Sequence, residues 1–146
     1  MADPTLDRAA LVAARRRFYD AVERGDLDAM AQLWKPGEDT VCVHPGFGQL
    51  RGTATILRSF ALLMAQASYV QYVLTEEVVD LHGDTAVLGC TENMMVAGHD
   101  EPVQGFDSWR AVATSVFVRT EGAWRLVVHH ASVLGEEWRP WEEVRT

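Results

Sequence analysis

The stretch that decides the fold runs from residue 122 to residue 132 and reads GAWRLVVHHAS. It is mostly apolar, which predicts a strand, and alternate side chains of a strand share a face. One face starts apolar and ends in polar groups, comprising Trp124, Leu126, Val128, His130 and Ser132. We expect this face to run from a packed core into a pocket wall, with His129 pointing the other way.

Three more strand-like segments precede this one, at residues 69–81, 85–96 and 109–120. His82-Gly83-Asp84 is a hairpin signal between the first two, and residues 97–108 read as a long loop. Sequential segments joined by turns predict an antiparallel meander. A twisted sheet of this kind has one dry face, which must be covered by other elements.

Apolar residues recur at helical spacing in the first half of the chain, over residues 5–24, 26–34 and 52–64. A short strand is expected at 40–44, followed by the irregular segment 47–49. Three helices followed by four long strands predict an α+β fold. We expect a strongly curved antiparallel sheet whose concave side is only partly closed by the helices, which leaves a cone-shaped cavity.

The composition is that of one globular domain of 146 residues, with 48% hydrophobic and 23% charged residues. A net charge of −8 disfavours nucleic acid and anionic membrane surfaces as partners. No apolar run reaches the length of a membrane span, and the N-terminus lacks the pattern of a secretory signal. We therefore expect a cytoplasmic protein with both cysteines, Cys42 and Cys90, reduced and buried.

Several segments, in this order and spacing, resemble the SnoaL-like proteins of the nuclear transport factor 2-like superfamily. They are FYDA at 18–21, VCVHPG at 41–46, ATSVF at 113–117 and the stretch at 122–132. The resemblance covers residues 7–133 and leaves 134–146 as a tail, within one SnoaL-like domain over 1–146. It implies a cone-shaped, cystatin-like roll with an internal pocket, and usually a dimer. Apolar residues on the outer sheet face also favour a homodimer through that face.

Glu92 is the most informative candidate for catalysis, because it interrupts an apolar row on the strand at 85–96. A carboxylate in such a row can act as a general base or acid, and otherwise forms an ion pair with Arg51, Arg110 or Arg119. His130 and His44 are the other two candidates, since histidine exchanges protons near neutral pH. The alternative role for His130 is a structural hydrogen bond, for example with Tyr19.

Two histidines and a carboxylate could also ligate a metal, but no ligand motif of short spacing supports a metal site. No glycine-rich phosphate loop indicates a cofactor. A pocket for a small hydrophobic molecule is expected instead. Its candidate lining residues are Tyr19, Trp34, Phe60, Met64, Phe106, Trp109, Ser115 and Ser132.

Two functions follow from these features and from the resemblance. The first is a dimeric, pocket-bearing protein that binds a small molecule and has no assigned activity. The second is a cofactor-independent isomerase, dehydratase or cyclase, in which Glu92 or His130 moves a proton and His44 orients the substrate. A protein-binding adaptor is a third class, and it predicts a small or filled cavity and an exposed apolar surface patch.

Overall fold

The computed structural model describes residues 3–98 and 107–135 of the chain. Three helices come first, α1 (Pro4–Arg24), α2 (Leu27–Leu33) and α3 (Thr53–Gln66), with two short strands, β1 (Val41–Val43) and β2 (Gln49–Arg51), before α3. Four long strands follow: β3 (Ala67–His82), β4 (Thr85–Gly98), β5 (Asp107–Thr120) and β6 (Ala123–Val133). The predicted α+β order is confirmed. The short strand β2 was not predicted; it begins at Gln49, the last residue of the segment expected to be irregular.

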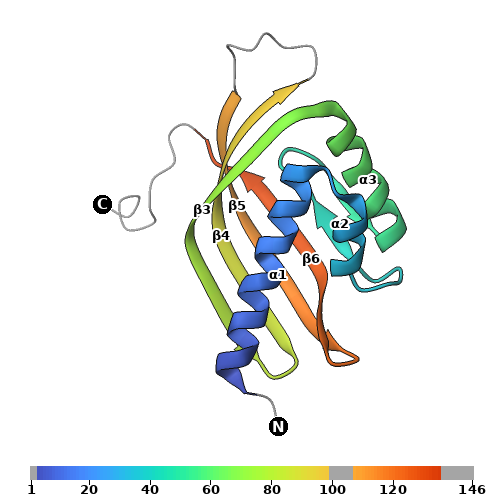
Figure 1. Cartoon of the computed structure of the whole chain (residues 1–146), viewed down its shortest axis with the longest axis vertical. Coiled ribbons are helices and arrows are strands. Elements are labelled where there is room, and N and C mark those ends of the chain that lie inside the picture. The colour runs from blue at the N-terminus through green and yellow to red at the C-terminus, as the bar shows by residue number, and fades with distance from the viewer. Residues whose placement is uncertain (1–2, 99–106, 136–146) are drawn as a thin grey trace.

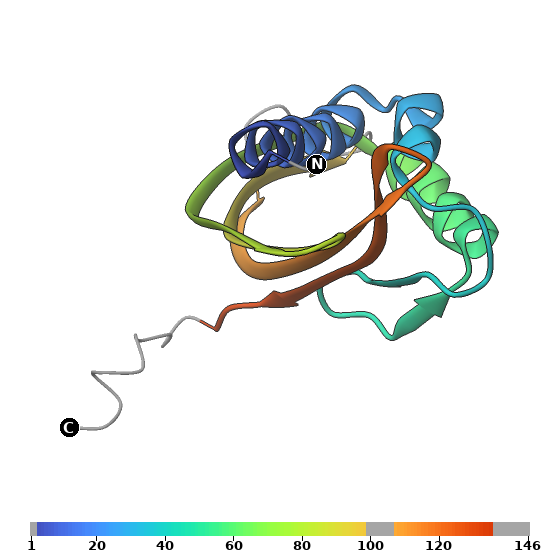
Figure 2. The same cartoon turned by 90° about the horizontal axis from the view of Figure 1, so that it is seen from below.

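All six strands form one sheet in the order β2-β1-β6-β5-β4-β3. The pairs are antiparallel except for β1 and β6, which run parallel. Figure 1 shows α1 lying along the sheet, with α2 and α3 beside it. In Figure 2 the long strands curl beneath α1, so that the concave face of the sheet looks toward this helix.

The core lies between the helices and the concave face of the sheet. Side chains from α1 and α2 meet alternate residues of β4, β5 and β6, as a half-buried sheet requires. The largest fully buried members are Leu11, Tyr19, Met30, Trp34, Ile56, Leu88, Phe117 and Leu126.

The edge strand β3 has a bulge at Glu76 and Glu77. These two residues of β3 lie opposite a single residue of β4, Cys90, and the strands pair regularly on either side. Glu76 has a positive φ of 53°, which is uncommon for a residue other than glycine. Arg15 of α1 is buried beside this bulge, and its guanidinium lies 3.2 Å from Glu77 and 3.3 Å from the carbonyl of Val78. The bulge thus anchors the middle of α1 to the sheet.

A second bulge lies in β6 and changes which residues face the interior. Val128 pairs with Val116 and Leu126 pairs with Phe117, so Val127 has no counterpart on β5. An extra residue reverses the alternation beyond it. Trp124 and Leu126 are buried as expected, but beyond the bulge His129 and Ala131 are buried while His130 and Ser132 are exposed. The prediction that His130 and Ser132 face the pocket, and His129 the outside, is therefore wrong.

An ion-pair cluster holds the start of α1 to the far end of the sheet. Arg119 lies 2.7 Å from Asp7 and 3.1 Å from Asp84, and its guanidinium stacks over Trp124 at 4.5 Å. The hydrogen bond from Arg119 is the main cause that lowers the pKa of Asp7 below its usual range.

This lowered pKa predicts how acid destabilises the fold. A carboxylate whose pKa is depressed in the folded state adds stability above its unfolded pKa, and that contribution is lost as the pH falls through the folded pKa. We expect Asp7→Asn to lower the melting temperature at about pH 7, and the gap to wild type to narrow toward about pH 3. Thermal melts of both proteins across this range test the prediction; a gap that stays constant would contradict it.

Candidate functional site

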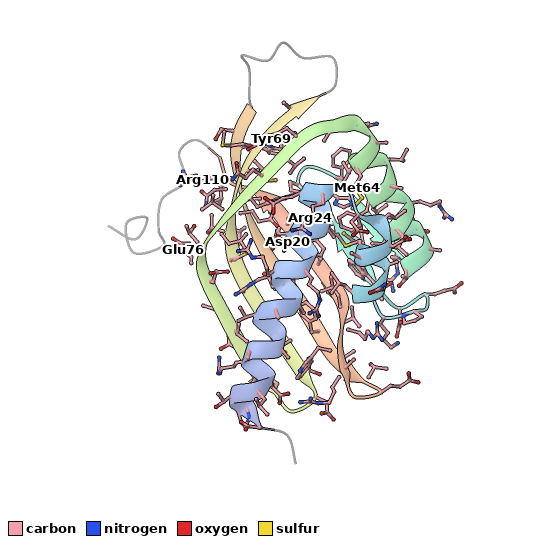
Figure 3. All side chains as sticks on the ribbon, viewed as in Figure 1. Asp20, Arg24, Met64, Tyr69, Glu76 and Arg110 are labelled. Carbon is pink, nitrogen blue, oxygen red and sulfur yellow. The ribbon has the colours of Figure 1, made fainter. Side chains whose placement is uncertain are left out.

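A cavity of about 280 Å³ opens at the wide end of the sheet, between the C-terminal end of α1, α3 and the strands. Figure 3 labels three of its lining residues, Arg24 on α1, Met64 on α3 and Tyr69 on β3. Most of the wall is apolar, with Phe18, Phe60, Tyr72, Met94, Val96 and Trp109 among the lining residues. The volume lies near the lower end for small-molecule pockets, so the cavity suits a compact ligand.

Glu92 lies on the cavity wall and is only 3% exposed. Its position on β4 follows from simple alternation with Cys90 and Met94, which are also buried. The hydroxyl of Tyr19 on α1 donates a 2.6 Å hydrogen bond to Glu92 Oε2. Burial, and then the nearby Glu92 and Cys90, raise the pKa of Tyr19 far above its usual value, so Tyr19 keeps its proton and remains a donor.

His129 lies beside Glu92, where the bulge at Val127 places it. Its Nε2 is 3.6 Å from Glu92 Oε2, beyond a formed hydrogen bond, and its Nδ1 is 2.8 Å from the hydroxyl of Ser115. The ring is 4% exposed and lies against Phe18, with 4.4 Å between ring centroids. Ser115 and Phe18 therefore fix the orientation of the imidazole at the cavity wall.

His44 follows β1 and forms another part of the wall. Its Nε2 lies 2.8 Å from the hydroxyl of Ser59 on α3, and its ring meets Phe60 edge-on at 4.9 Å. Burial, and then the electrostatic effect of His129, lower the pKa of His44 to about 4, although Glu92 partly opposes them. The ring is therefore neutral at pH 7.

Several polar atoms of the cavity-lining residues make no hydrogen bond to a described residue. They include Glu92 Oε1, His44 Nδ1, the hydroxyl of Tyr72 and His129 Nε2, which approaches Glu92 Oε2 only at 3.6 Å. They are not sealed off either, since in the described part of the chain the indole N–H of Trp34 is the one buried side-chain atom that lacks a partner. These atoms are therefore available to a ligand. A carboxylate and two imidazoles can accept, hold or return protons.

Only some of the predicted site residues reach the cavity. Glu92 and His44 reach the cavity, as do Phe60, Met64 and Trp109, whereas Tyr19 and Ser115 lie behind the wall and position Glu92 and His129. Trp34 is 1% exposed and packs in the core instead of lining the cavity. His130 and Ser132 are exposed, because the bulge in β6 reverses the alternation of the strand beyond it. Phe106 lies outside the described residues.

Glu92 does not form the expected ion pair with an arginine in the described structure. Within the described residues its partners are Tyr19 and His129, while Arg119 pairs with Asp7 and Asp84. Sequence reasoning missed His129 because it lies next to His130, and the two can be told apart only by the phase of the strand. Over the ranges 3–98 and 107–135, no group of three histidine, cysteine or acidic side chains could hold a metal ion.

The coupling among these groups predicts how the pKa of His44 responds to substitution. His129 lowers this pKa and Glu92 raises it, so His129→Asn should raise the pKa of His44 from about 4 and Glu92→Gln should lower it further. NMR titration of the His44 ring in the three proteins measures both shifts. Equal pKa values in wild type and both variants would show that the three groups are not electrostatically coupled.

Comparison with known proteins places this chain in a family. The SnoaL-like domain model matches residues 11–136. No curated protein matches the chain. A provisionally named dehydratase of the nuclear transport factor 2-like family from Streptomyces avermitilis is 38% identical, with a TM-score of 0.83 over 91% of this chain and 99% of that one.

Two further solved structures are similar. One is a provisionally named aromatic ring hydroxylase from Novosphingobium aromaticivorans, 25% identical over 92% of this chain and 93% of that one, with a TM-score of 0.79. The other is a provisionally named calcium/calmodulin-dependent protein kinase type II association domain from Thiobacillus denitrificans, 27% identical over 84% and 94%, with a TM-score of 0.66. With its curved sheet, three helices and matching domain model, this chain belongs to the SnoaL-like family of the nuclear transport factor 2-like superfamily.

Proposed function

We propose that this protein is a cofactor-independent lyase or isomerase that transfers a proton within a small, largely apolar molecule held in the cavity. The observation that carries the proposal is the group of three atoms without a hydrogen bond to a described residue, Glu92 Oε1, His129 Nε2 and His44 Nδ1, on the wall of a largely apolar cavity. The similarity to a provisionally named dehydratase, at 38% identity over nearly the whole of that chain, favours elimination of water as the reaction.

In such a reaction Glu92 takes the proton from carbon. Its Oε2 is already bound by Tyr19, so Oε1 is the oxygen that faces a substrate. Elimination of water also requires a proton on the departing hydroxyl, and His129 is the group next to Glu92 that can deliver one through Nε2. The C–H and C–O bonds break, a C=C bond forms, and the hydroxyl leaves as water. An isomerisation uses the same first step and returns the proton to another carbon.

The apolar wall contributes in two ways. It excludes water from the reacting atoms, which strengthens their electrostatic interactions. It also favours compact substrates, since the cavity holds about 280 Å³ and Phe18, Phe60 and Met94 lie in its wall.

Binding without reaction is the second candidate function, and the largely apolar wall with a few fixed polar groups favours it equally. In this case Glu92, His129 and His44 are polar anchors that orient a ligand. The two functions differ in one measurable respect, because anchors affect affinity and a proton carrier affects rate.

Proton exchange in D₂O tests the catalytic function with a panel of small molecules in place of an identified substrate. We expect the protein to exchange carbon-bound protons, or eliminate water, in members of a panel of small cyclic hydroxyketones followed by NMR. Glu92→Gln should lower the rate by about 10²- to 10⁴-fold, the usual contribution of a general base, and His129→Asn should also lower it. His130→Asn is the matched control, since it removes the neighbouring exposed imidazole and should leave the rate unchanged.

Two results would contradict this assignment. The first is an equal loss of rate in His129→Asn and His130→Asn. The second is a Glu92→Gln variant that binds a panel member and retains the wild-type rate.

We also propose that the protein is a homodimer formed through the convex face of the sheet. Val73, Met95 and Val112 project from this face and are 57%, 41% and 40% exposed in the single chain. Apolar side chains on three adjacent strands form a surface that association would cover.

Val112→Asp should therefore convert a dimer into a monomer, because pairing would bury two uncompensated carboxylates near the two-fold axis. Light scattering after size exclusion measures the mass. Val12→Asp is the control, since Val12 is 47% exposed on α1, away from the sheet face. A monomeric wild type, or dimers of both variants, would contradict the proposed interface.

A further inference from the structure

The hydroxyl of Ser59 has one proton, and the structure shows where it goes. Ser59 Oγ lies 2.6 Å from the main-chain carbonyl oxygen of Ile56, three residues earlier in α3. A carbonyl oxygen can only accept, so the proton of Ser59 is donated to it. His44 Nε2 lies 2.8 Å from the same Oγ, and therefore the imidazole is the donor in that second bond.

This hydrogen-bond count determines the tautomer of His44. A neutral imidazole with its proton on Nε2 has a lone pair, and no proton, on Nδ1. The ring is neutral at pH 7, since burial is the main cause that lowers its pKa to about 4. Nδ1 has no partner among the described residues, and the ring forms part of the cavity wall.

We infer that Ser59 fixes the tautomer of His44, and that the cavity binds a small apolar molecule with a hydroxyl group that donates its proton to His44 Nδ1. This inference rests on the cavity being the functional site proposed above, and it names the chemical class of its ligand. Ser59 is a positioning residue, because it contacts His44 and does not itself line the cavity.

The other polar atoms of the cavity favour the same ligand class. Glu92 Oε1 is also an acceptor without a hydrogen-bond partner among the described residues, so it offers a ligand hydroxyl a second acceptor beside His44 Nδ1. An ether or ketone oxygen placed against either atom would set lone pair against lone pair and leave a desolvated acceptor unsatisfied. A hydroxyl group satisfies one of them, and a molecule with two hydroxyl groups can satisfy both.

The tautomer can be measured on the free protein. In ¹⁵N NMR spectra at neutral pH, we expect the His44 ring to carry its proton on Nε2 and to show an unprotonated Nδ1. A ring that carries its proton on Nδ1 would overturn the inference, whether or not any ligand is known.

The ligand class is tested with matched pairs of an alcohol and its methyl ether, namely phenol with anisole and benzyl alcohol with benzyl methyl ether. In NMR titrations of wild type we expect each alcohol to bind about tenfold more tightly than its ether, as for one buried hydrogen bond. Equal affinity within the pairs, or no binding of either alcohol at millimolar concentration, would overturn the inference.

Substitutions then assign the preference to the two residues. His44→Gln retains a group that can reach Ser59 but lacks Nδ1, and it should weaken the preference for the alcohol, because Glu92 Oε1 is then the acceptor that remains. Ser59→Ala should weaken the preference and Ser59→Thr, which retains the hydroxyl, should restore it; thermal melts verify that each variant is folded. A preference that persists unchanged in both His44→Gln and Ser59→Ala would overturn the assignment.

Glu92→Gln separates this inference from the proposed reaction. This variant should lose proton transfer and still distinguish alcohol from ether, because His44 and Ser59 are intact. If wild type shows the preference but catalyses no proton transfer, the proposed reaction fails and the ligand class stands. If it catalyses proton transfer without the preference, the ligand class fails and the reaction stands.

Discussion

A carboxylate buried on the concave face of a curved sheet is the constraint around which this protein is built. An unpaired buried charge is far too costly to persist, so Glu92 requires partners close by. Tyr19 supplies a proton donor from α1, and its raised pKa makes it a permanent one. Because that donor comes from a helix, the position of α1 on the sheet and the protonation chemistry of the cavity are coupled.

The same helix also protects the exposed edge of the sheet. Along β3, Arg8 donates to the carbonyl of Val79, Arg15 approaches the carbonyl of Val78, and Glu23 accepts from the main-chain N–H of Tyr72. Free edges invite pairing with other chains, and side chains that occupy the edge prevent it. These three contacts lie along α1 on both sides of Tyr19, so they fix the helix where its phenol must reach Glu92. Edge protection and site geometry are therefore provided by one element.

The sequence predicted the fold well and the site only in part, and the reason is physical. Periodicity and turn residues indicate the helices and the four long strands, but the three-residue strand Gln49–Arg51 is too short to show a period. Glu92 was identifiable because a carboxylate in an apolar row is a strong signal. His129 was not, because the bulge falls at Val127-Val128, where two identical apolar residues hide the change of phase. The sequence of a strand indicates which side chains face the core only where its two faces differ in polarity.

The three polar atoms of Glu92, His129 and His44 that make no hydrogen bond to a described residue are the feature on which the proposed ligand site rests. A polar network with a purely structural role would differ in this respect. A network that only braces the fold gains stability by satisfying every member, since each buried unsatisfied group costs about 1–3 kcal/mol. Here Tyr19, Ser115 and Ser59 each form a hydrogen bond with one side of Glu92, His129 and His44, in that order. The other side of each group makes no hydrogen bond to a described residue, although His129 Nε2 approaches Glu92 Oε2 at 3.6 Å. The supporting residues thus hold the three groups in place while leaving one atom of each for something else to bind. Among the described residues, only the indole N–H of Trp34 is a buried polar side-chain atom without a hydrogen bond. The open atoms at the cavity are therefore accessible to a bound molecule, as the proposed function requires.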